Sequence, residues 1–180
     1  MVPRVSRCYP GRLRAVETSI GGVLGLGDPY HVGIAVRDLD DAMRIFGETF
    51  GIGAWALLEA ETPAIYRGVP SSSGVRAAYA RSGGIYLELV QPTKGPWTAS
   101  AFLEEHGEGI YHLGYWVDDM PAALARAEAA GIGVDTAMPP GDNVIAAYLD
   151  AKPTLGVHVE LVSAQMRPYI ENLVAKAEPQ

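Results

Sequence analysis

Hydrophobic and polar positions follow the same order twice along this chain. In the first half, the apolar, β-branched run at 30–36 predicts a buried strand. Asp38 then suits the N-cap of a helix that runs to about Phe50 and stops at Gly51. Residues 62–74, with two prolines and three consecutive serines, predict a loop. Three more strands are expected at 54–60, 75–80 and 85–90. This half therefore predicts one strand, one helix and three strands.

The second half repeats this order after a connecting segment. Proline and glycine interrupt residues 91–109, where at most one helical turn is expected, at 99–106. Apolar residues at 110–117 predict a strand, and Asp119 is expected to cap a helix at 122–130. The remaining strands are expected near Val134, at 144–149 and at 157–162.

The corresponding strands of the two halves also share specific residues. Residues 30–38 (YHVGIAVRD) and 111–119 (YHLGYWVDD) carry Tyr, His, Gly, Val and Asp in register, at an offset of 81 positions. The closing strands, 86–90 (YLELV) and 158–162 (HVELV), both have glutamate in the third position. Each half therefore begins with a strand that carries a histidine and ends with a strand that carries a glutamate.

These strands supply four residues of the kinds that bind a divalent metal: His31, Glu88, His112 and Glu160. Side chains alternate along a strand, so His31 shares its face with small residues while the opposite face is apolar. If the first and last strands of each half are neighbours, each half contributes one imidazole and one carboxylate. A pseudo-twofold axis would then bring the two pairs together.

The other two histidines lie outside this pattern. His106 stands in a polar segment and is expected on the surface. His158 is two residues from Glu160, so a pocket-lining, a ligand-supporting and an exposed position all remain open. Five more residues are candidates either for the pocket wall or for the core: Trp55, Tyr79, Trp116, Asn143 and Tyr148.

Composition limits the classes of partner. The 180 residues carry a formal net charge of −7 and no run of Lys or Arg, which argues against nucleic acid as a partner. No segment reaches the roughly 18 unbroken apolar residues of a membrane helix, so no membrane partner is expected. Cys8 is the only cysteine, which excludes an intrachain disulfide and fits a cytoplasmic protein.

Both ends of the chain differ from the repeated region. Residues 1–29 combine four arginines with a glycine-rich stretch and are expected to form an N-terminal arm. Residues 165–180 are expected to form a helical tail whose apolar side suits a sheet edge or a second subunit in a homodimer. That apolar side consists of Tyr169, Ile170, Leu173 and Val174.

Over residues 30–164 the repeated motifs resemble the vicinal oxygen chelate superfamily, which includes glyoxalase I, methylmalonyl-CoA epimerase, extradiol dioxygenases and bleomycin resistance proteins. The resemblance implies an α+β fold in which two tandem βαβββ modules, 30–93 and 110–164, form a cup-shaped mixed sheet with helices outside. It also implies that the cup holds one metal ion through four ligands. These ligands are His31, Glu88, His112 and Glu160.

Different segments resemble different members of this superfamily. The His-Glu-His-Glu set resembles that of bacterial glyoxalase I, whereas residues 104–112 and 141–145 look more like epimerases. In the epimerases a general-base glutamate lies on the third strand of the first module. The matching position here is Ala77, and residues 74–80 contain no carboxylate.

The sequence thus favours a metal-dependent isomerase or lyase acting on a small molecule with a carbonyl or thioester. Zn, Ni, Co or Mn would polarise the carbonyl. The glyoxalase resemblance implies Glu160 as the mobile base and Glu88 as its counterpart, able to return the proton on the other face. An extradiol-type Fe(II) dioxygenase and a non-catalytic protein that binds a drug or metabolite are the alternatives.

Overall fold

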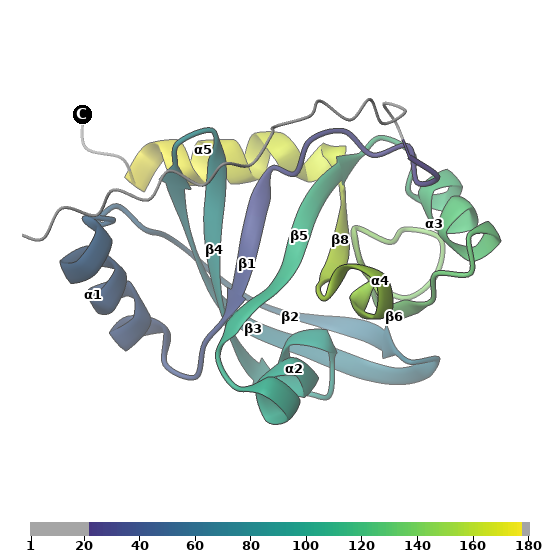
Figure 1. Ribbon diagram of the computed structural model, residues 1–180, viewed down its shortest axis with the longest axis horizontal. Coiled ribbons are helices and arrows are strands. Elements are labelled where there is room, and N and C mark those ends of the chain that lie inside the picture. The colour runs from purple at the N-terminus through teal and green to yellow at the C-terminus, as the bar shows by residue number, and fades with distance from the viewer. Residues whose placement is uncertain (1–21, 178–180) are drawn as a thin grey trace, which may run out of the picture.

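The computed structural model describes residues 22–177, which form a mixed α and β structure around one curved sheet (Figure 1). Most of the predicted arm at 1–29 falls in residues 1–21, outside the described residues. The first half contains β1 (His31–Ala35), α1 (Leu39–Phe50), β2 (Ala56–Tyr66), β3 (Val69–Ser82) and β4 (Ile85–Lys94). The second half contains α2 (Thr98–His106), β5 (Gly109–Val117), α3 (Met120–Ala129), β6 (Val134–Met138), β7 (Ala146–Leu149), α4 (Lys152–Leu155), β8 (His158–Ser163) and α5 (Arg167–Ala177).

The eight strands close into a barrel in the order β1-β4-β3-β2-β6-β7-β8-β5. The first and last strands of each half are parallel neighbours, β1 with β4 and β5 with β8, which meets the condition set in the sequence analysis for pairing one histidine with one glutamate. Strands β1 and β5 are antiparallel neighbours and join the two halves. The α+β class and the helices outside a curved sheet are confirmed, and the sheet forms a closed barrel.

Two aspartates fix where the helices begin. The Asp38 side chain accepts a hydrogen bond from the backbone N–H of Asp41 at 3.0 Å, which caps α1. Asp119 does the same for α3 through the N–H of Ala122 at 2.9 Å. Both predicted N-caps are therefore confirmed.

The loop predicted at 62–74 is wrong, because these residues belong to a long hairpin. Strands β2 and β3 pair continuously, from Ala56 opposite Tyr79 to Tyr66 opposite Val69. The turn consists of Arg67 and Gly68, both with positive φ (47° and 79°), as in the tight turns that suit twisted hairpins. Strand β2 pairs with β6 only at Ile65 and Tyr66, and β3 pairs with β4 only from Gly74 onward. The prolines therefore lie on strand edges, where a missing N–H is tolerated.

Helix α5 crosses one end of the barrel (Figure 1). It buries Ile170 and Val174, with 4% and 1% of their surface exposed, against Ala77 and Tyr79 of β3. Within the described residues the predicted amphipathic tail is a helix over Arg167–Ala177, and Ile170 and Val174 of its apolar side face the barrel. Burial of such side chains stabilises the folded state by about 1.5–3 kcal/mol each.

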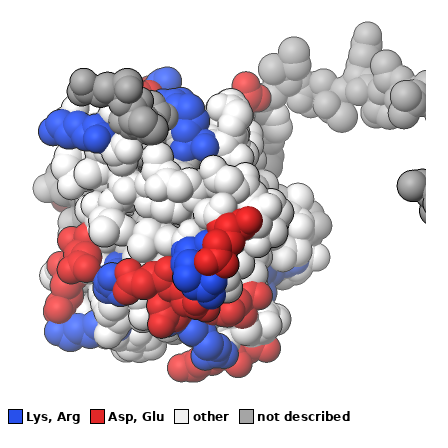
Figure 2. All heavy atoms as spheres, turned by 90° about the vertical axis from the view of Figure 1, so that its left-hand side faces the viewer, with Lys and Arg blue, Asp and Glu red and all other residues white. Residues whose placement is uncertain are grey.

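Charges of both signs intermix on the face that carries α1, and uncharged residues occupy the middle of the view (Figure 2). Arg44 pairs with Asp41 at 2.6 Å, and Arg76 pairs with Asp40 at 3.2 Å and with Glu59 at 3.0 Å.

Within residues 22–177, no helix combines the length and the apolar character needed to cross a membrane.

Candidate metal centre

Four contiguous strands of the barrel, β4-β1-β5-β8, bring the predicted ligand residues together. Gly33 of β1 lies opposite both Glu88 of β4 and His112 of β5. Gly114 of β5 lies opposite both His31 and Glu160. Glu88 is thus in register with the glycine two residues after His31. Glu160 is in register with the glycine two residues after His112.

One ligand atom from each residue lies within 4.8 Å of the other three. Glu88 Oε2 is 3.1 Å from His31 Nε2 and 3.2 Å from His112 Nε2. Glu160 Oε2 shows the same separations, 3.1 Å and 3.2 Å. The two Nε2 atoms also face each other at close range. Both histidines are completely buried, and the glutamates are 6% and 7% exposed.

Each imidazole occupies the space above a glycine of the opposite strand. A Cβ on Gly33 would overlap the ring of His112, and a Cβ on Gly114 would overlap the ring of His31. The small residues that the sequence places beside each histidine are therefore needed by the histidine of the other half. This reciprocal packing fixes where both Nε2 atoms point.

Charges within the group shift its proton equilibria. Burial by itself lowers the pKa of His31, but attraction to Glu88 and Glu160 outweighs it and raises that pKa to about 9. Burial raises the pKa of each glutamate, yet the facing imidazoles hold both pKa values below their usual range. Without a metal, the group therefore contains two carboxylates and a protonated His31 at neutral pH.

The two carboxylates differ in their contacts with tyrosine. Tyr79 lies opposite Glu88, and its hydroxyl donates a hydrogen bond to Glu88 Oε1. Tyr148 lies opposite Glu160 in the same way, but its ring packs edge-on against His112, with ring centroids 5.4 Å apart. Among the described residues, the polar partners of the Glu160 carboxylate are the two imidazoles alone. Both carboxylates thus face the imidazoles through Oε2, and Glu88 alone is also held by a tyrosine hydrogen bond on Oε1.

The residues present fit a divalent cation. Glu88 Oε2 forms no hydrogen bond within residues 22–177, although it is buried and faces both imidazoles. Two nitrogen and two oxygen donors converge on one point, a donor set suited to Zn, Ni, Co or Mn. Two carboxylates would balance the charge of such an ion.

A cavity of about 190 Å³ leads to these carboxylates. Its lining includes Glu88, Glu160, Tyr79 and Tyr148. It also includes three residues at the start of α5 and just before it, which the sequence analysis did not assign to the pocket wall. These three are Met166, Tyr169 and Ile170. Their position depends on where α5 packs, which no local pattern specifies. A larger hollow of about 710 Å³ beside α3 contains none of the four ligand residues.

The remaining candidates from the sequence lie elsewhere. Trp55 packs between α1 and the sheet and donates to the carbonyl of Ile52 at 3.0 Å. Trp116 stacks on Tyr30, with ring centroids 3.6 Å apart. Asn143 is exposed in a surface loop.

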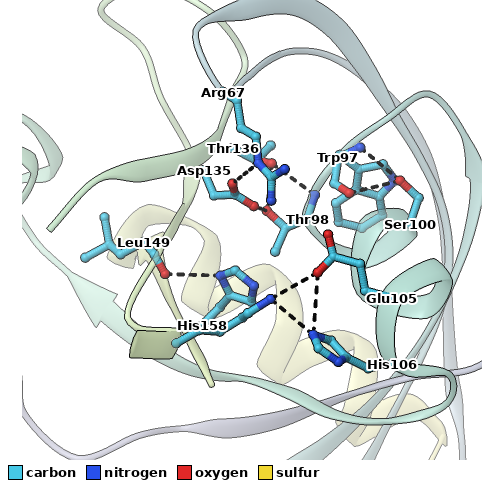
Figure 3. Close-up of polar contacts among 11 residues, drawn as sticks. Arg67, Trp97, Thr98, Ser100, Glu105, His106, Asp135, Thr136, Leu149 and His158 are labelled. Atoms are coloured by element: carbon cyan, nitrogen blue, oxygen red, sulfur yellow. Dashed lines mark hydrogen bonds and ion pairs between the residues drawn. The ribbon is translucent and has the colours of Figure 1, made fainter. Parts of the chain in front are cut away.

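Figure 3 shows where the other histidines lie, in a polar cluster near α2. His106 is exposed, as predicted, and its Nε2 lies 3.2 Å from Lys152 Nζ. His158 is only 3% exposed and Nδ1–H donates to the carbonyl of Leu149 at 3.3 Å. Burial lowers the pKa of His158, because it disfavours the charged imidazolium. Neither histidine joins the group of four.

Comparison with known proteins gives one family and several related structures. Residues 30–148 match the family described as the glyoxalase/bleomycin resistance protein/dioxygenase superfamily. The uncharacterized protein YqjC of Bacillus subtilis is 26% identical over 133 residues, which cover 73% of this chain and 88% of that protein.

Two similar structures are of methylmalonyl-CoA epimerases. One, in complex with methylmalonyl-CoA and NH4+, is 26% identical, has a TM-score of 0.51, and is matched over 77% of this chain and 94% of that one. The other, a variant from Streptomyces coelicolor in complex with 2-nitronate-propionyl-CoA, gives the same four values: 26% identity, a TM-score of 0.51, and 77% and 94% coverage.

The glycine packing predicts that Gly33→Ala and Gly114→Ala each weaken zinc binding roughly 10–100-fold, because the added methyl displaces the imidazole above it. Gly53→Ala is the control, because no heavy atom lies within 4 Å of a Cβ built there. Calorimetric titration of each variant with zinc measures the effect. Wild-type zinc affinity in both Gly33→Ala and Gly114→Ala would contradict the assigned positions of the imidazole rings.

The raised pKa of His31 predicts proton release on metal binding. His31 is protonated below pH 9 in the metal-free protein, and only its neutral form is a ligand. Zinc affinity should therefore rise about tenfold per pH unit from pH 6.5 to 8.5, with roughly one proton released. Titrations in buffers of different ionisation enthalpy measure that proton. A zinc affinity that is independent of pH would show that His31 is not a ligand. In a separate test, the double variant His31→Ala, His112→Ala should bind no zinc at this site.

Proposed function

Because this chain belongs to the glyoxalase/bleomycin resistance protein/dioxygenase superfamily, also known as the vicinal oxygen chelate superfamily, we propose that it is a metal-dependent isomerase or lyase. The proposed reaction moves a proton at the carbon next to a carbonyl or thioester. The convergence of two imidazoles and two carboxylates beside a mostly apolar cavity carries this proposal. The methylmalonyl-CoA bound by a related epimerase supports a thioester as one candidate substrate.

His31, His112, Glu88 and Glu160 would hold one divalent ion, with Zn, Ni, Co and Mn as candidates. When bound, the ion would polarise a substrate carbonyl and make the neighbouring C–H more acidic. The protein side chains would move the proton and position the substrate.

We assign the role of base to Glu160. A carboxylate that takes a proton from carbon must be able to move toward it, and Glu160 has fewer bonds holding it than Glu88 has. The facing imidazoles hold the pKa of Glu160 below its usual range, so it is a carboxylate at neutral pH. Glu88, held by Tyr79, would serve as the fixed ligand and could return the proton on the other face.

Ala77 marks a departure from the epimerases in this superfamily. Ala77 is 1% exposed and lines the cavity, where it can neither donate nor accept a proton. Arg76 beside it points to the other face, where it pairs with Asp40 and Glu59. The group of four must therefore supply any base, which favours glyoxalase-like use of Glu160.

Fe(II) dioxygenase chemistry is less well supported. It commonly uses two histidines and one carboxylate and leaves the other positions open for substrate and oxygen. Here a fourth donor, Glu88, is buried and fixed in place by Tyr79.

We also propose that residues 30–93 and 110–164 are two tandem βαβββ modules of this domain. The strand order supports it, since each half contributes four adjacent strands in the corresponding sequence, β1-β4-β3-β2 and β5-β8-β7-β6. Superposition of the two halves in a crystal structure should place His31 on His112 and Glu88 on Glu160. A different path of the chain in the two halves would contradict it.

The assignment of the base predicts the behaviour of Glu160→Gln. This variant should still bind metal, because an amide oxygen and three other donors remain, but it should lose proton exchange. We expect solvent deuterium incorporation into substrate to fall about 10²–10⁴-fold, the usual contribution of a general base. The measurement is mass spectrometry on a panel of acyl-CoA thioesters and hemithioacetals incubated in D₂O.

Glu128→Gln is the matched control, since Glu128 is exposed on α3 and does not line the cavity that contains Glu88 and Glu160. It should exchange at the wild-type rate. Wild-type exchange in Glu160→Gln as well would show that another residue is the base.

A further inference from the structure

Apart from its two carboxylates, the cavity wall carries no charged side chain. Of residues 22–177, no lysine, arginine or histidine lines the cavity. Most of the wall is aliphatic or aromatic, from β2, β3, β7 and the segment that leads into α5. Its apolar members include Leu58, Ala60, Val75, Met138, Met166 and Ile170.

The charge of the ligand group leaves no excess positive charge for a substrate. A divalent ion, two neutral imidazoles and the carboxylates of Glu88 and Glu160 sum to zero. A carboxylate on the substrate that did not itself bind the ion would be buried without a cationic partner. Such burial is strongly unfavourable in an apolar environment.

The cavity also limits the size of what enters it. Its volume of about 190 Å³ compares with the roughly 150 Å³ of an engineered apolar cavity that admits benzene. One ring or one short branched chain therefore fits beside the carbonyl. A handle as large as coenzyme A would have to remain outside.

We propose that the part of the substrate beyond the metal-bound oxygen is an uncharged, apolar acyl or aryl group no larger than about one benzene ring. This proposal rests on the proposed function, because it assumes that an oxygen of the substrate binds the ion. On β2, the alternate residues Leu58, Ala60 and Thr62 line the cavity and would contact this group. Met166, Tyr169 and Ile170, just before α5 and at its start, also line the cavity, where α5 packs against β2 and β3.

Two hydroxamates test this proposal on the full-length, zinc-loaded protein. Both 4-methylpentanohydroxamate and succinic mono-hydroxamate chelate zinc through the same group, but the first ends in isopropyl and the second in a carboxylate of similar shape. Calorimetry should give about tenfold or more tighter binding for 4-methylpentanohydroxamate, the value expected for burying such an apolar group. Equal or tighter binding of succinic mono-hydroxamate would overturn the proposal.

A gain of charge at the wall provides the complementary test. Ala60 is an exposed position that lines the cavity, so Ala60→Arg should place a cation there without disturbing the core. We expect it to strengthen binding of succinic mono-hydroxamate several-fold and to narrow the ratio of the two affinities. Leu57→Arg is the matched control, because Leu57 is 52% exposed on the opposite face of β2 and should leave the ratio unchanged.

The outcomes separate this proposal from the proposed function. Elemental analysis comes first, and a protein that takes up no zinc would overturn the metal centre and this proposal with it. Zinc uptake without binding of either hydroxamate would overturn the acyl cavity alone. An unchanged affinity ratio in Ala60→Arg would show that β2 does not face the bound group.

Discussion

The close approach of strands β1 and β5 determines the rest of this site. His31 and His112 each occupy the space that a side chain would need on the glycine opposite, Gly114 or Gly33. Neither Nδ1 atom has a hydrogen-bond partner among residues 22–177, so packing rather than hydrogen bonding orients the rings. Both Nε2 atoms consequently face one point, and carboxylates from the two flanking strands reach that same point. A strand order that separated β1 from β5 would leave two half-sites.

The two halves contribute equivalent ligands but unequal surroundings. Tyr79 and Tyr148 lie opposite Glu88 and Glu160 in matching register, yet only Tyr79 donates to its glutamate. This difference gives one carboxylate a fixed role and leaves the other able to move. Both carboxylates are only 6% and 7% exposed beside a mostly apolar cavity, and this burial strengthens their electrostatic interactions with the imidazoles. The matching residues of the two halves thus form the proposed metal site, and the difference in tyrosine contacts supports different proposed roles for the two glutamates.

The sequence predicted the four converging residues because duplication left a periodic trace, histidine and glycine at fixed spacing in both opening strands. It could not predict what depends on packing between distant segments. The hydrogen bond from Tyr79 and the place of Ile170 in the cavity wall are of this kind. At 62–74, proline and serine indicated a loop, but pairing with a partner strand outweighed local preference. The N-caps at Asp38 and Asp119 were predictable because capping is local.

The central claim is that His31, Glu88, His112 and Glu160 bind one divalent ion together. A crystal structure of the zinc-loaded protein, with anomalous scattering recorded on both sides of the zinc absorption edge, tests it most directly. The account predicts a single zinc peak at about 2.0–2.3 Å from one nitrogen of each histidine and one oxygen of each glutamate. A peak elsewhere, or one bound by residues of only one half of the chain, would contradict it.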